Sequence, residues 1–348
     1  MKRPSLAKRV LFALPIAALV LAGIELAARR FAPVPKGAQF GQQSWVVGEI
    51  LRLDDASTNW TGDPELLWRL KPHAQVNWGA TSGYDGHMEH LTTRLNGYGW
   101  RGPEVAAKMA GERRALHLGD SCTWGIGTPE RETYAARLGP LLEARASGRW
   151  SSVNAGVPSY SSFQGFRLFA RYQDELAPDV VTIYFGWNDA WMMSPDAGNH
   201  IMSTGPGGRV LRALYRSTAF QRARLFVFDT LPERNTPRVA PDDFRANVLA
   251  MVERARGAGT PAILIVPPVG PDPRTMQPTR EPANHAYVAV LRELGGEPGV
   301  TLVDAARDFE ASEHPLYFHD PIHPNSAGHA RIAELLADAI AGLPGIAR

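Results

Sequence analysis

From residue 115 onward the sequence alternates short apolar runs with longer amphipathic stretches, and this alternation restricts the fold more than any other feature. The apolar runs, each with the character of a buried strand, are residues 115–118, 152–154, 180–185, 262–266 and 300–303. Helical faces between them are formed by Tyr134, Leu138, Leu141 and Leu142, by Phe163, Phe166, Phe169 and Tyr172, and by Phe244, Val248, Met251 and Val252. Five strands with helical crossovers predict an α/β fold in which a parallel sheet is covered on both faces.

The first 30 residues form a separate segment in which basic residues flank an apolar run. Residues 10–28 contain one charge, Glu25. At 1.5 Å per residue they span roughly 28 Å, close to a bilayer core of ~30 Å. A cleaved signal peptide is the alternative, but no pair of small residues at i and i+2 lies between residues 10 and 40, so an uncleaved transmembrane anchor is favoured. We expect Glu25 to reach the interface or to pair with Arg29.

The basic residues around this run predict its orientation. Four lysines and arginines precede the run and two follow it. The positive-inside rule therefore predicts a cytoplasmic N-terminus, with the body of the protein on the other side of the membrane.

Charge and cysteine content exclude several classes of protein. The net charge is +2, but residues 1–30 hold six basic residues and one acid, so the other 318 residues have a net charge of −3. A basic nucleic-acid surface on the folded part is therefore not expected, and we predict no nucleic-acid partner. Cys122 is the only cysteine, which excludes an internal disulfide and a cysteine-based zinc site.

The chain divides into three parts by composition. Residues 1–30 are the anchor, 31–110 are a linker followed by an irregular, partly β lead-in, and 111–348 are the main domain. His87, Glu89 and His90 in the lead-in lack the spacing of a zincin, so we interpret them as a solvated loop.

The main domain contains a long insertion at residues 190–240. Its arginines lie among apolar residues, at Arg209, Arg212, Arg216, Arg222 and Arg224. Two interpretations stay open: a lid or membrane-surface helix attracted to anionic lipid or glycan, and a packed helix with a solvated basic face.

A serine follows the first predicted strand, at the edge where parallel sheets carry their sites. Gly119 allows a tight turn there, so that the hydroxyl of Ser121 is exposed at the mouth of the sheet. Thr123 stands where Gly-x-Ser-x-Gly has its last glycine, which argues against a conventional α/β-hydrolase elbow.

Two further strand ends offer hydrogen-bond donors. The N–H of Gly156, the side-chain amide of Asn188 and the N–H of Ser121 could converge on a developing oxyanion. The alternative makes Gly156 a turn residue and Asn188 a helix cap.

Near the C-terminus, Asp320 and His323 are spaced so that a carboxylate and an imidazole share one side of a turn. Asp320 can then hold one ring nitrogen while the other faces a nucleophile. Pro324 biases His323 toward a loop, before a helix that Asn325 or Ser326 would cap. We expect the neighbouring histidines, His314, His319 and His329, to be structural.

Taken in order, these segments resemble the SGNH (GDSL) hydrolase family, whose four blocks carry a Ser, a Gly, an Asn and a His. Ser121 matches the first block, Gly156 the second, Asn188 in its Gly-x-Asn-Asp setting the third, and His323 with Asp320 the last. The resemblance covers roughly residues 112–343 and implies a flavodoxin-like three-layer α/β/α fold with strand order 2-1-3-4-5. Residues 91–104 look like the lead-in of membrane-anchored members.

The resemblance also implies a mechanism. Ser121 would attack an ester carbonyl, and His323 would act as general base and then protonate the leaving alcohol, while Asp320 orients the imidazole. The oxyanion would lie against Ser121, Gly156 and Asn188. Neither a metal nor an organic cofactor is implied.

Three functions are compatible with these residues. The leading one is a membrane-anchored esterase of the bacterial inner membrane, with its domain in the periplasm or outside the cell, acting on a carbohydrate or lipid ester such as an O-acetyl group. An O-acyltransferase would use the same residues, and a non-catalytic envelope-binding protein would keep only the fold. Trp124 and Trp187, close to Ser121 and Asn188 in sequence, are expected either to line the substrate site or to pack in the core.

Overall fold

A computed structural model describes most of the chain between residues 6 and 346. The described residues are 6–31, 59–63, 65–79, 90–146, 148–193, 206–214, 217–220, 222–223, 236–271, 284–311 and 317–346.

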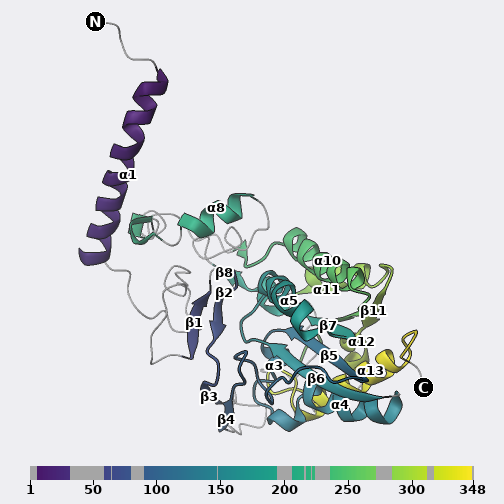
Figure 1. The fold of residues 1–348 in the computed structure, drawn as a ribbon. Coiled ribbons are helices and arrows are strands. Elements are labelled where there is room, and N and C mark those ends of the chain that lie inside the picture. Colours follow the sequence, from purple (N-terminus) through teal and green to yellow (C-terminus); the bar gives the residue numbers. More distant parts are fainter. Residues whose placement is uncertain are drawn as a thin grey trace, which may run out of the picture.

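A five-stranded parallel sheet forms the centre of the main domain (Figure 1). Its strands are β5 (Glu112–Gly119), β6 (Arg149–Gly156), β7 (Val180–Tyr184), β10 (Ala262–Ile265) and β11 (Val300–Val303). They lie in the order β11-β10-β7-β5-β6, and every pairing is parallel. Counted along the chain, this is the order 2-1-3-4-5, which confirms the expected fold. Each of the five apolar runs lies within one of these strands or overlaps most of it.

Helices cover both faces of the sheet, and the central strands β7 and β10 are therefore buried along their whole length. One face carries α4 (Tyr134–Arg145), α12 (Ala305–Glu310) and α13 (Ser326–Ala341). The other carries α5 (Ser162–Leu176), α10 (Pro241–Gly257) and α11 (His285–Leu294). The predicted helical faces are the buried ones, except that Leu141, Phe166 and Tyr172 are only partly buried at the margins.

The lead-in contributes two antiparallel pairs of strands outside the main sheet. They are β1 (Trp60–Asp63) with β2 (Leu67–Leu70), and β3 (Gln75–Gly79) with β4 (His90–Arg94). Trp60, Trp68 and Trp100 are buried in the same hydrophobic cluster as Phe163 of α5. The lead-in therefore extends the core of the main domain.

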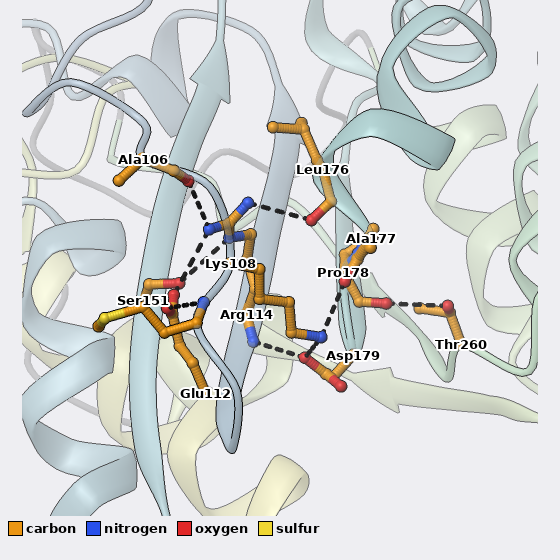
Figure 2. Close-up of polar contacts among 11 residues, drawn as sticks. Ala106, Lys108, Glu112, Arg114, Ser151, Leu176, Ala177, Pro178, Asp179 and Thr260 are labelled. Carbon is orange, nitrogen blue, oxygen red and sulfur yellow. Dashed lines mark hydrogen bonds and ion pairs between the residues drawn. The ribbon is translucent and has the colours of Figure 1, made fainter.

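The amino ends of the strands are fastened to the lead-in by buried and half-buried polar contacts (Figure 2). The Arg114 guanidinium, in β5, donates to the carbonyls of Ala106 and Leu176 at 2.8 and 3.1 Å. Lys108 lies 2.6 Å from the Asp179 carboxylate, which also accepts the Arg114 N–H at 2.6 Å. These contacts tie the lead-in to the edge of the sheet opposite the one that carries the serine.

The N-terminal helix α1 (Leu6–Phe31) projects away from the rest of the protein (Figure 1). Its segment Phe12–Phe31 is long and apolar enough to cross a membrane, with a mean hydropathy of 1.8. Glu25 and Arg29 form the expected ion pair at 2.7 Å.

The described part of the insertion includes β8 (Met192–Met193), α8 (Pro206–Leu214) and β9 (Thr236–Pro237), and residues 218–220 and 222–223 are also helical. Strand β8 pairs with β9, so the two ends of the insertion meet beside the main sheet.

Candidate active site

Ser121 begins a short helix, α3 (Ser121–Trp124), directly after β5. Gly119 is the last residue of the strand, and a Cβ placed on it would lie 1.9 Å from Oγ1 of Thr123. The glycine is thus needed for the close approach of α3, rather than for the turn conformation expected from the sequence. Asp120 caps the helix by accepting the N–H of Cys122 at 2.8 Å. This packing holds Ser121 at the carboxyl end of the sheet.

The structure brings Ser121, His323 and Asp320 together, although 202 residues separate the serine from the histidine. The distance from Ser121 Oγ to His323 Nε2 is 2.9 Å, and that from His323 Nδ1 to Asp320 Oδ2 is 2.7 Å. The other oxygen of Asp320 accepts the N–H groups of Ile322 and His323 at 2.9 and 2.8 Å. These two bonds close the turn that the spacing predicted. The arrangement can pass a proton from a serine hydroxyl to an imidazole whose orientation is fixed.

The Asp320 carboxylate is held in its ionised form. Burial opposes ionisation, but the hydrogen bond and charge of His323 and the two backbone N–H groups outweigh it and lower the pKa of Asp320 to about 2. A permanent negative charge beside Nδ1 stabilises an imidazolium at His323.

Asn188 lies on α6 (Trp187–Ala190), a short helix that follows β7. Its Nδ2 donates to Oδ2 of Asp120 at 3.2 Å, which leaves the second amide hydrogen to point elsewhere. Asp120 therefore links the serine helix to the amide predicted as an oxyanion donor. We did not predict this role from the sequence, although an aspartate directly before a helix is a common capping signal.

Gly156 ends β6 against α3, where a Cβ would lie 2.5 Å from the backbone nitrogen of Trp124. Its N–H donates to Oδ1 of Asn154 at 3.0 Å. This differs from the expected open donor, because Gly156 can serve an oxyanion only by sharing or leaving that bond. Asn154, which the sequence analysis did not single out, also donates to the carbonyl of Thr123 at 2.9 Å.

The two tryptophans have different surroundings. Trp124 is 3% exposed and belongs to the hydrophobic core, so its packing leaves little surface for a substrate. Of the two expectations for Trp124, the structure favours packing in the core. Trp187 is partly buried against the cluster under α4 and α13 and stays a candidate lining residue.

Arg101 of the lead-in supports the loop that follows the serine helix. Its buried guanidinium donates to the carbonyls of Trp124, Gly125 and Thr128 at 2.9, 2.6 and 2.6 Å. From the sequence we assigned Arg101 to the lead-in but did not predict this contact. It joins Arg101 to residues 23 to 27 positions further along the chain, so no local pattern indicates it.

Asp189 is a buried carboxylate next to Asn188. It accepts from the N–H and the hydroxyl of Ser162, at 2.9 and 2.6 Å, and so joins α6 to the start of α5. Burial raises the pKa of Asp189 to about 7, despite the hydrogen bonds from Ser162. Arg238, from the returning end of the insertion, is buried nearby and donates to the carbonyl of Ser159 at 2.5 Å.

The remaining histidines do not join this site where they are described. His329 is buried in α13 and accepts the N–H of Tyr134, and burial lowers its pKa to about 3. His319 contacts the hydroxyl of Thr128 at 3.2 Å. His87, Glu89 and His314, and the side chain of His90, lie outside the described residues. Among the residues that are described, no group of three or more His, Cys, Asp or Glu could hold a metal ion.

Residues 117–331, more than half of the chain, match the GDSL-like Lipase/Acylhydrolase family. The chain belongs to this family. As a member of the GDSL family, the protein is an ester-hydrolysing enzyme. No curated protein matches the chain.

Solved structures similar to this GDSL enzyme include a lipase/acylhydrolase, an esterase and an alpha/beta hydrolase. A lipase/acylhydrolase from Enterococcus faecalis is 20% identical, with 68% of this chain and 100% of that chain covered and a TM-score of 0.46. The psychrotrophic esterase EstA from Pseudoalteromonas sp. is 16% identical, with 66% and 96% covered and a TM-score of 0.42. LAE5, from the metagenome of Lake Arreo, is 23% identical, with 65% and 94% covered and a TM-score of 0.43.

Proposed function

We propose that this GDSL enzyme is a membrane-anchored serine esterase that works through an acyl-enzyme on Ser121. The observation that carries the proposal is the continuous chain of hydrogen bonds from Ser121 Oγ through His323 to Asp320, with lengths of 2.9 and 2.7 Å. Both lengths lie within the reach that a nucleophile and its general base need.

In the first half of the reaction, Ser121 Oγ attacks the ester carbonyl carbon while its proton moves to Nε2 of His323. The negative charge that develops on the carbonyl oxygen is stabilised by the second N–H of the Asn188 amide and by the N–H of Ser121, which lies in the first turn of α3. His323 then gives its proton to the departing alcohol oxygen, and the acyl group stays on Ser121.

In the second half, water replaces the alcohol. His323 takes a proton from the water, the resulting hydroxide attacks the acyl carbon, and the C–O bond to Ser121 breaks as the serine regains its proton from Nε2. Asp320 stabilises the imidazolium in both halves without changing its own protonation.

We further propose that α1 anchors the enzyme in the bacterial inner membrane, with the catalytic domain on the periplasmic side. The 20-residue apolar segment Phe12–Phe31 supports the anchor, and the basic residues before it support the orientation. The proposed substrate is a carbohydrate or lipid ester of that compartment, such as an O-acetylated glycan.

The test uses the full chain in lipid nanodiscs with p-nitrophenyl acetate, butyrate and octanoate, each with and without an oligosaccharide acceptor. We expect hydrolysis that is lost in Ser121→Ala and kept in Ser326→Ala, a matched change at the half-buried first residue of α13. Acylated oligosaccharide formed at the expense of free acid would instead assign acyl transfer. Activity that survives Ser121→Ala would overturn the proposal.

A further inference from the structure

Helix α8 in the insertion exposes the apolar residues that a packed helix would bury. Pro206, Val210, Ala213 and Leu214 share one side of the helix by their spacing, and all four are exposed. Val210 is 61% exposed and Leu214 is 43% exposed, and among residues 206–210, 213 and 214, whose burial is described, only Gly208 is buried. This exposed apolar side favours the interpretation as a membrane-surface helix over that of a packed helix with a solvated basic face.

The charge of the same segment has a single sign. Residues 197–228 contain five arginines and neither aspartate nor glutamate. In α8 the exposed Arg209 lies beside the apolar side, and Arg212 follows it at the i+3 position. An apolar strip next to basic residues is the pattern of helices that lie in the interface of a bilayer containing anionic lipid.

A second contact ties this segment to the end of the membrane helix. The carboxylate of Glu25 in α1 accepts the Ser217 hydroxyl at 2.7 Å and the N–H groups of Thr218 and Ala219 at 2.9 and 3.0 Å. The Ser217 N–H in turn donates to the carbonyl of Leu214, the last residue of α8. Figure 1 shows α8 near the end of α1 closest to the main domain, and not parallel to α1.

The position of Glu25 sets the depth of this contact. Glu25 precedes Phe31, the end of the apolar segment, by six residues, which is roughly 9 Å along a helix. Amphipathic interfacial helices bury their apolar side about 5–10 Å into the boundary between headgroups and acyl chains. The contact thus places the C-terminal end of α8 at the depth where such helices lie.

We propose that α8 docks on the anionic lipid surface from which α1 emerges, and that the contact of Glu25 with residues 217–219 holds it there. Val210 and Leu214 enter the interface, and Arg209 faces lipid phosphates. The inference rests on the anchoring role of α1 in the proposed function. Because the insertion begins two residues after Asn188 and its two ends pair as β8 and β9, docking also ties the segment that follows Asn188 to the membrane.

The test places an environment-sensitive fluorophore on single cysteines of the full chain in nanodiscs that contain spin-labelled lipid as a quencher. The positions are Val210 and Leu214 in α8, Leu19 in α1, and Met109, an exposed residue of the lead-in. Cys122 is buried, so the unmodified chain gives the labelling background. We expect several-fold stronger quenching at 19, 210 and 214 than at 109.

Two comparisons sharpen the test. Quenching at 210 and 214 should fall several-fold in discs of neutral lipid alone and in Glu25→Ala, while quenching at 19 should not change. If position 19 is quenched but 210 and 214 behave like 109, the docking of α8 is wrong and the anchor stands. If position 19 is also unquenched, the anchor is wrong and the docking proposal falls with it. Equal quenching at 210 and 214 in neutral and anionic discs would overturn the proposal that α8 docks on anionic lipid through its arginines.

Discussion

At the scale of single residues, the hydrogen bond between His323 and Asp320 fixes which imidazole nitrogen faces the serine. Replacing Asp320 with Asn keeps the size of the side chain but removes the charge and lets an amide face Nδ1. We expect Asp320→Asn to lower kcat by about 10³–10⁴-fold, because the wrong tautomer then faces Ser121. Steady-state kinetics on a p-nitrophenyl ester check this, with melting curves as the control for folding. A variant as active as the wild type would contradict the role of Asp320.

The amide of Asn188 has a second N–H that we propose as an oxyanion donor. Asn188→Ala should lower kcat by about 10²–10³-fold with a smaller change in KM, because the lost bond matters most in the transition state. Asn154→Ala is the comparison variant. It removes the acceptor of the Gly156 N–H and so leaves that N–H free to donate to the oxyanion. A large rise in KM with unchanged kcat in Asn188→Ala would instead indicate a role in substrate binding.

Sequence alone could predict that Ser121, His323 and Asp320 meet, because each follows a strand end or lies within a tight local turn. The partners of these residues were harder to predict. Asp120, after β5, accepts a hydrogen bond from Asn188, after β7. Asn154, in β6, donates to the carbonyl of Thr123 in α3. Each contact joins residues far apart in the chain, so no local sequence pattern predicts it. Trp124 shows the opposite difficulty, because closeness in sequence to Ser121 does not say which way a side chain points.

At the scale of elements, Asp189 connects α6 with the start of α5 inside the core. Its folded pKa of about 7 lies above its ordinary value of 3.8, so between these limits the folded state holds a proton that the unfolded state has released. Stability from this group is therefore present at low pH and is lost as pH rises to about 7.

Replacing Asp189 with Asn should remove this loss of stability between about pH 4 and pH 7, because Asn does not ionise. We expect the melting temperature of the wild type to fall relative to Asp189→Asn from about pH 4 to about pH 7, and the two curves to run parallel at higher pH. Thermal melting across this range makes the comparison. Parallel curves throughout would show that Asp189 is ionised in the folded protein at acidic pH.

The elements of the sheet follow from the sequence because strands buried on both faces read as continuous apolar runs, such as Val180–Tyr184. The lead-in strands did not stand out in the same way. They are four or five residues long and mix Trp and Leu with polar residues, and they acquire their order by packing on α5.

At the scale of the whole molecule, residues 101–114 fasten the lead-in to both ends of the sheet. Arg101 bonds the loop after the serine helix, and Arg114 bonds the amino ends of the strands. Arg101→Met should destabilise the protein by about 3 kcal/mol, because three buried carbonyls lose a charged donor. Arg131→Met, at a guanidinium that is 84% exposed, is the matched control and should change little. Equal unfolding free energies for the two variants in urea would contradict this account.

The contact between Glu25 and residues 217–219 joins positions almost 200 residues apart. From the sequence, Glu25 was only a charge inside an apolar run with a possible partner at Arg29. Its second set of partners depends on where the insertion lies in space, which no periodicity or spacing records.

The measurement that most directly tests the central claim is covalent labelling of the full-length enzyme with a fluorophosphonate, followed by peptide mass mapping. We expect one adduct, on the peptide that contains Ser121, that is absent in Ser121→Ala and forms much more slowly in His323→Ala, because the base that activates the hydroxyl is then missing. A folded protein that takes up no label, or takes it up at another residue, would contradict the assignment of Ser121 as the nucleophile.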